Sequence, residues 1–99
     1  MQHQNLISID VFCANHNIEI SFINSLQQTG LIKITTIKKT GFIDADQLLQ
    51  LEKFIRFYYE LDINLEGIET ITHLLNRIYS MHNEIIALKN RIRFYETNE

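Results

Sequence analysis

A heptad pattern over the last third of the chain constrains its fold more than any other feature. From residue 71 to residue 95, apolar residues recur at alternating spacings of three and four without interruption. They are Ile71, Leu74, Ile78, Met81, Ile85, Leu88, Ile92 and Tyr95. This spacing is typical of a coiled coil, in which each helix buries one apolar stripe against a partner helix. We therefore predict a helix from Leu65 to about Tyr95 and a dimer interface formed by these side chains.

The length of this helix indicates that the partner is a second copy of the chain. From Leu65 to Tyr95 it would extend roughly 46 Å at about 1.5 Å per residue. A globule of 99 residues is only about 35 Å across. The end of the helix must then project and expose its apolar stripe, and pairing with a second copy is the simplest way to bury it. The pattern alone allows a parallel or an antiparallel coiled coil.

The first part of the chain predicts two short helices. Ser8 can cap the first helix, and Asn17 ends it. Its apolar positions lie on one face and are Ile9, Phe12, Cys13 and His16. The second helix runs from Glu19 to Thr29 and buries Phe22, Ile23 and Leu26. Gly30 stands where a left-handed residue is expected to stop that helix.

A β-hairpin and a linking helix are predicted next. Residues 32–37 are β-branched and partly alternating, residues 39–41 form a turn, and Phe42 and Ile43 return as a short strand. Asp44 and Gln47 resemble a capping box, in which each side chain caps the other's backbone. The helix that they open carries an apolar stripe of Leu48, Leu51, Phe54, Ile55, Phe57, Tyr58 and Leu61.

This order of elements predicts a mainly α protein built on a winged helix-turn-helix with a small hairpin. Asp62 to Asn64 interrupt the linking helix, and Asn64 can cap the long helix that follows. We place the winged helix-turn-helix with its linking helix in residues 1–62, and the dimerisation helix in residues 63–99.

Acidic residues are concentrated in the middle of the chain. Residues 44–69 contain Asp44, Asp46, Glu52, Glu60, Asp62, Glu66 and Glu69 against only Lys53 and Arg56. The net charge of the whole chain is −3. Two interpretations remain open: a solvated helix face, or a docking surface for a basic partner.

Enzymatic and metal chemistry have little support in the residues. Cys13 and His16 have a spacing that two metal ligands can use, but His3, His73 and His82 lie in other segments. A buried free cysteine is the better interpretation. The glycines are too scattered for a phosphate loop. We expect no metal, no cofactor and no catalytic residues.

The chain is expected to be cytoplasmic. It has a single cysteine, no apolar run long enough for a membrane span, and a polar start that lacks the features of a signal peptide.

Basic residues argue against specific DNA binding. The second predicted helix has no basic residue, and residues 1–43 have no arginine, the side chain that most often reads bases. Lys33, Lys38 and Lys39 around the hairpin could still contact phosphates. They keep DNA binding open as an alternative.

The order of elements resembles the MerR superfamily, and the motifs within it are most similar to the chaperone-modulator family CbpM. The match rests on Glu60 to Ile68 (a Leu-Asp pair, then Gly-Ile opening the long helix), on Phe12-Cys13, and on the tail from Ile85 to Tyr95. True MerR regulators have arginine-containing elements where this chain has residues 21–24 and 41–44. The groups expected to hold DNA are therefore missing.

The resemblance implies a non-enzymatic homodimer, with an antiparallel coiled coil favoured. Such a protein would bind the J-domain of a DnaJ-like co-chaperone and block its action on the partner ATPase chaperone. Asp44, Asp46, Glu52, Glu60 and Asp62 are the expected partner-binding residues. A reduced MerR-like transcriptional regulator is the first alternative, and a purely structural dimerisation module is the second.

Overall fold

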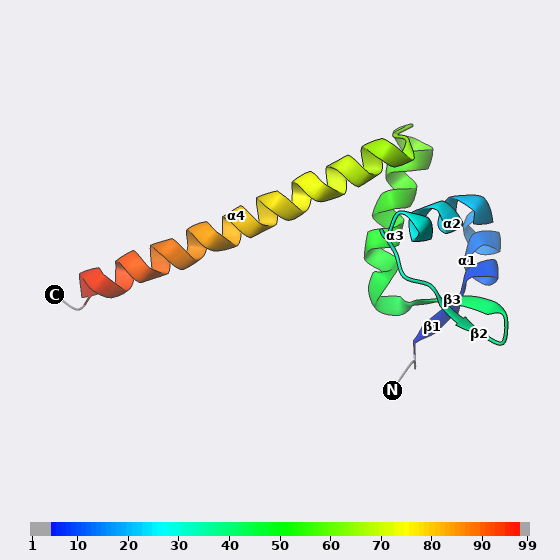
Figure 1. Ribbon diagram of the computed structural model, residues 1–99, viewed down its shortest axis with the longest axis horizontal. Coiled ribbons are helices and arrows are strands. Elements are labelled where there is room, and N and C mark those ends of the chain that lie inside the picture. Colours follow the sequence, from blue (N-terminus) through cyan, green and yellow to red (C-terminus); the bar gives the residue numbers. More distant parts are fainter. Residues whose placement is uncertain (1–4, 98–99) are drawn as a thin grey trace. The chain divides into compact units, whose positions relative to one another are not determined.

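The computed structural model describes residues 5–97 and is mainly helical, with one small antiparallel sheet (Figure 1). In chain order the elements are β1 (Leu6–Ser8), α1 (Ile9–His16), α2 (Ile20–Gln28), β2 (Thr35–Ile37), β3 (Thr40–Asp44), a 3₁₀ turn (Ala45–Gln47), α3 (Leu48–Ile55), a π-helical segment (Arg56–Glu60) and α4 (Leu65–Thr97). The chain forms two compact units, one ending at Glu69 and the other beginning at Thr70. This architecture confirms the predicted fold class, a MerR-like winged helix-turn-helix with a long final helix.

The sheet contains one strand that the sequence analysis did not predict. Its order is β1-β3-β2, and β1 pairs with β3 through Ile7 opposite Ile43. The backbone N–H of Ala45 donates to the carbonyl of Asn5 at 2.8 Å and extends this pairing by one step. A strand of three residues is too short to show an alternating pattern in the sequence, so only its pairing with β3 defines it.

The hairpin between β2 and β3 is tighter than predicted. Ile37 pairs with Thr40, so the loop consists of Lys38 and Lys39 alone, and Thr40 already belongs to the strand. Both lysines have positive φ, 50° and 68°. Two central residues of positive φ are the signature of a type I′ turn, which normally selects Asn or Gly. The prediction of a turn at residues 39–41 was therefore displaced by one residue, because lysine is an unusual choice at these positions.

The helix-turn-helix forms as the sequence predicts. The Ser8 hydroxyl accepts from the backbone N–H of Val11 at 3.4 Å, and Asn17 ends α1 with φ 59°. Gly30, at φ 82°, follows the end of α2. The N–H groups of Gly30 and Leu31 donate to Gln27 and Leu26, which makes the end of α2 a Schellman motif.

The core of the first unit draws on every helix. Its buried side chains are Ile9, Phe12, Cys13, Ile18, Phe22, Ile23, Leu26, Ile32, Ile43, Leu51, Phe54 and Ile68. Ile68, in the first turn of α4, is fully buried. The first turn of the long helix is therefore part of the winged helix-turn-helix core.

The capping box predicted for Asp44 and Gln47 does not form. Asp44 Oδ1 accepts from the backbone N–H of Asp46 at 3.2 Å and so caps the 3₁₀ turn. The Gln47 side-chain amide instead bonds to both backbone groups of Lys33, accepting at 2.8 Å and donating at 3.0 Å. It ties the loop before β2 to the start of α3. This long-range partner could not be predicted from local spacing.

The apolar stripe of α3 is narrower than predicted. Leu51 and Phe54 are buried and Leu48, Ile55 and Phe57 are partly buried, but Tyr58 and Leu61 are exposed. The π-helical segment widens one turn by a residue and so rotates Leu61, which follows it, while Tyr58 within the segment keeps one face against the buried Phe22. Asp62, at φ 56°, ends this helical run. Asn64 then caps α4 as predicted, its Oδ1 accepting from Gly67 N–H at 2.8 Å.

Candidate partner-binding surfaces

The predicted partner-binding acids lie in three separate surface hollows. Asp44 and Asp46 line one with Lys33 and Gln47, while Glu52 and Glu60 line a second. Asp62 lies in a third. The structure therefore brings together two pairs of these residues but does not place all five in one site.

Asp44 and Asp46 differ in their availability to a partner. Asp44 is half-buried, and one of its oxygens is engaged in capping the 3₁₀ turn. Asp46 is exposed. Lys33 lines the same hollow and offsets part of their negative charge. The hollow along α3 is not more acidic, since Lys53 and Arg56 accompany Glu52 and Glu60 there, but it has the exposed apolar side chain of Leu49, which this hollow lacks.

The outer face of α3 combines charge with an exposed apolar side chain. Glu52, Arg56 and Glu60 follow one another at intervals of four residues and are all exposed. Leu49, one turn earlier, is 82% exposed. Leu49, Glu52, Lys53, Arg56 and Glu60 line a common hollow of about 580 Å³. A protruding leucine surrounded by charged groups of both signs is typical of a protein-binding surface with an apolar centre and a polar rim.

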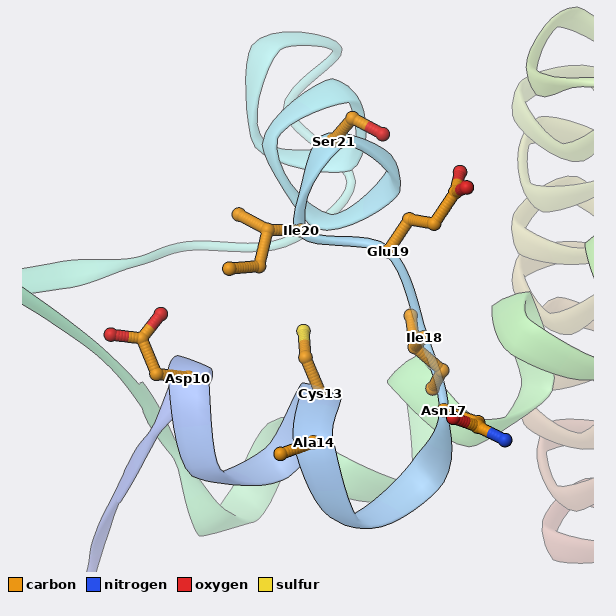
Figure 2. Close-up of a pocket in the computed structure, with 8 residues that line it drawn as sticks. All are labelled: Asp10, Cys13, Ala14, Asn17, Ile18, Glu19, Ile20 and Ser21. Carbon is orange, nitrogen blue, oxygen red and sulfur yellow. The ribbon is translucent and has the colours of Figure 1, made fainter.

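A further hollow, which no pattern in the sequence predicted, lies between α1 and α2 (Figure 2). Its volume is about 710 Å³. Its lining consists of Asp10, Cys13, Ala14, Asn17, Ile18, Glu19, Ile20 and Ser21. Figure 2 shows the Cys13 sulfur pointing from α1 toward the start of α2, into the space that Ile20 also enters. Both charged lining residues, Asp10 and Glu19, are acidic. The hollow depends on how two helices pack, which local sequence patterns do not reveal.

Cys13 has the properties of a structural thiol. Its side chain is buried, as predicted, and forms no disulfide. Burial raises the pKa of the thiol, and the nearby Asp10 carboxylate raises it further. A raised pKa keeps the sulfur protonated at neutral pH, and the protonated thiol is a poor nucleophile and a poor metal ligand.

His16, whose spacing from Cys13 would suit two metal ligands, is used locally. His16 Nδ1 lies 3.0 Å from the Phe12 carbonyl, and its ring stacks on Phe12 at 4.2 Å between centroids. Within residues 5–97 there is no cluster of three His, Cys, Asp or Glu side chains that could hold a metal ion. His3 lies outside the described residues.

The elements that would face DNA carry few positive charges. The helix α2 exposes the uncharged side chains Ser21, Asn24, Gln27 and Gln28, and it contains no Lys or Arg. Lys38 and Lys39 are exposed at the tip of the hairpin, and Lys33 is exposed just before β2. At the hairpin, these three lysines are the side chains that could contact a phosphate backbone.

The apolar seam of α4 is exposed in the second unit. Seven seam residues, from Leu74 to Tyr95, have 48 to 64% of their surface accessible, and Ile71 is half-buried. Tyr79, Ile86 and Phe94 add exposed apolar surface beside the seam. None of the described helices is both long and apolar enough to cross a membrane. The dimer interface itself remains a prediction.

Two short helices, a β-hairpin and a long final helix define the class of this protein: a winged helix-turn-helix followed by a long helix. Residues 7–90 match the family model described as "MerR HTH family regulatory protein". The chain therefore belongs to the MerR family of helix-turn-helix regulatory proteins, a family that is generally non-enzymatic. No curated protein and no solved structure matches the chain.

Proposed function

We propose that this protein is a non-enzymatic modulator that binds the J-domain of a DnaJ-like co-chaperone and blocks its action on the partner ATPase chaperone. The observation that carries the proposal is the distribution of charge over a MerR-type fold. The helix α2 has no cation, whereas Glu52 on α3 and Glu60 on the π-helical segment line one hollow with Lys53, Arg56 and the exposed Leu49. An exposed leucine among charges of both signs suits a protein partner better than a DNA duplex, and Glu52 and Glu60 are the groups that would meet cations of that partner.

The proposed mechanism is competition for one surface. By the resemblance to the CbpM family, the J-domain presents a basic helix and a His-Pro-Asp loop to its chaperone. The acids of α3 would bind that basic helix, and Leu49 would supply the apolar contact at the centre of the interface. While it is bound, the J-domain could not reach the chaperone. No bond is made or broken in this mechanism.

Dimerisation is the second part of the proposal. Pairing two copies of α4 through the seam from Ile71 to Tyr95 would bury the apolar surface that one chain exposes. Each dimer would then carry two copies of the α3 surface and could hold two J-domains.

Calorimetric titration of the full chain with the J-domain of the host's DnaJ-like co-chaperone tests the proposal. We expect saturable binding that weakens between about 50 and 200 mM salt, because steering by opposite charges is screened. Replacing Glu52 and Glu60 together by Lys should weaken binding by about tenfold or more. The control replaces the exposed residues Asn76, Ser80, Asn83 and Asn90 by Lys, the same change of four charges on the side of α4 away from the seam, with the oligomeric state checked by light scattering.

The outcome decides between surfaces as well as functions. Affinity that falls only in the Glu52/Glu60 variant supports the α3 surface. Affinity that falls equally in both variants indicates a general effect of net charge. An unchanged affinity in the α3 variant contradicts that surface, and absence of binding at either salt concentration contradicts the partner.

DNA binding is the second candidate function, because the family is one of regulators and the hairpin tip carries Lys38 and Lys39. Fluorescence anisotropy with a labelled duplex from the region upstream of the gene tests it. If the duplex binds, replacing Lys33, Lys38 and Lys39 by Gln should reduce the slope of log affinity against log salt by about 0.9 for each lysine that binds a phosphate in the wild type. Binding of DNA without binding of the J-domain would favour this candidate.

A further inference from the structure

Three aromatic rings form a cluster where α2 meets the π-helical segment. Phe22 and Tyr58 are stacked, with centroids 4.4 Å apart and planes 24° from parallel. Tyr59 is nearly perpendicular to both, at 5.6 Å from Phe22 and 5.1 Å from Tyr58. Phe22 is buried, whereas Tyr58 and Tyr59 are 37% and 41% exposed.

These distances determine which ring faces are covered. Tyr58 has one face against Phe22. Tyr59 is almost equally far from both stacked rings, so it lies beside the stack. Perpendicular rings that met edge to edge could not approach to 5 Å, so one face of Tyr59 covers the edges of the other two. The second face of Tyr58 and the second face of Tyr59 remain uncovered within this cluster.

The two tyrosines line a hollow of about 360 Å³ together with Asp62, Ile63 and Asn64. None of these described lining residues is a Lys or Arg. The exposed Glu19 lies beside the cluster, since its backbone N–H donates to the Tyr59 hydroxyl at 3.2 Å. The lining therefore combines two aromatic rings, whose faces carry negative potential, with the Asp62 carboxylate and contains no Lys or Arg.

Two tyrosine rings and a carboxylate that line one hollow are the groups that hold alkylammonium and guanidinium ions through cation–π and charge interactions. We infer that the hollow formed by Tyr58, Tyr59 and Asp62 is a binding site for a lysine or arginine side chain of a basic partner helix. This inference rests on the proposed function for the identity of the partner, the J-domain. It adds a contact outside the α3 surface and predicts which chemical group is recognised there.

The first test uses small cations and does not require the J-domain. The ¹⁵N-labelled full chain is titrated with butylammonium chloride, with sodium chloride at equal ionic strength, and with butan-1-ol as the uncharged analogue. We expect saturable amide shifts at Glu19 and at residues 58–64 with butylammonium alone. Asp62→Asn and Tyr59→Leu should abolish them.

The variants separate the site from the fold. Asn adopts positive φ as readily as Asp, so Asp62→Asn removes the charge without straining the backbone at φ 56°. Tyr59→Phe keeps the ring and loses only the hydrogen bond to Glu19, so it should retain cation binding. Tyr79→Leu, at an exposed tyrosine of α4, is the matched control and should change nothing.

The second test measures J-domain affinity by calorimetry with the same variants. Tyr59→Leu is expected to weaken binding about three- to thirtyfold and Asp62→Asn about three- to tenfold, while Tyr59→Phe and Tyr79→Leu stay near the wild type.

The two tests fail in distinguishable ways. Local butylammonium shifts without any J-domain binding would contradict the proposed function and leave the cation site standing. Normal J-domain binding that is unaffected by Tyr59→Leu and Asp62→Asn would overturn the inference that the partner uses this site. Absence of local butylammonium shifts would overturn the inference whatever the J-domain does.

Discussion

Replacing Ile78 and Ile85 by lysine should convert the proposed dimer into a monomer. Both residues lie on the apolar seam of α4, one heptad apart, and about half of each side chain is accessible in the single chain. In a coiled coil, whether parallel or antiparallel, both positions would face the partner helix. A lysine at such a position removes apolar burial and adds a charge that must be desolvated or displaced to the rim.

The magnitude follows from the exposed fractions. Complete burial of an isoleucine side chain is worth about 1.5–3 kcal/mol, so burying the exposed half of Ile78 or Ile85 recovers about 1 kcal/mol. Two substitutions in each of two chains remove about 4 kcal/mol of dimer stability. This corresponds to an increase of roughly a thousandfold in the dissociation constant, before any cost of desolvating lysine is added.

Sedimentation equilibrium over a range of protein concentrations measures this change directly. The matched control is Tyr79→Lys with Ile86→Lys. These residues are also exposed and one heptad apart on α4, and the substitution adds the same charge, but each lies one position after a seam residue. The control should dimerise within about tenfold of the wild type. Circular dichroism of both variants shows whether the helix survives.

Either of two results would refute this reasoning. A dimer that persists in the Ile78/Ile85 variant would show that the seam is not the interface. Equal weakening in the Tyr79/Ile86 control would show that the interface lies on a different stripe of α4.

Further predictions concern the winged helix-turn-helix unit. Because burial and then the Asp10 carboxylate raise the pKa of Cys13, its reaction with a thiol reagent at pH 8 should be much slower than in the unfolded chain, and Asp10→Asn should accelerate it. The raised pKa of Cys13 also makes stability depend on pH. The neutral thiol stabilises the fold fully below the pKa that Cys13 has in the unfolded chain, and this contribution is lost as the pH rises through its pKa in the folded chain. Unfolding titrations at alkaline pH should show this loss in the wild type but not in Cys13→Ala. Asn64→Ala removes the acceptor of the Gly67 N–H and should lower the melting temperature by about 4–8 °C, a loss of about 1 kcal/mol, whereas Asn64→Ser should preserve most of the stability. Lys38→Asn with Lys39→Gly places residues that adopt positive φ at lower cost at both turn positions and should raise the melting temperature by a similar amount. An unchanged value would show that the two lysines cost little in this conformation.

Local signals in the sequence were sufficient to predict four of the helix boundaries. Ser8, Asn17, Gly30 and Asn64 each begin or end a helix through contacts with residues a few positions away, and the structure confirms each one. The buried residues of α2 also follow from its period alone, since one face of an amphipathic helix must turn toward the core.

Features that depend on distant residues could not be predicted in this way. The Gln47 side chain bonds to Lys33, fourteen residues earlier, instead of capping its own helix. The strand β1 exists because β3 lies beside it. The π-helical segment interrupts the predicted apolar stripe and leaves Leu61 exposed after it, and no spacing rule indicates where such a segment occurs.

The same division applies to the candidate sites. The order of the elements, the acidic middle of the chain and the apolar seam of α4 can be read from the residues alone, because they follow from composition and period along the chain. Packing in three dimensions divides the acids among separate hollows. It also brings Tyr58 and Tyr59 into one hollow with Asp62 and packs both tyrosine rings against the buried Phe22. A binding site is made by side chains that meet through packing, and packing depends on contacts between segments that no local pattern records.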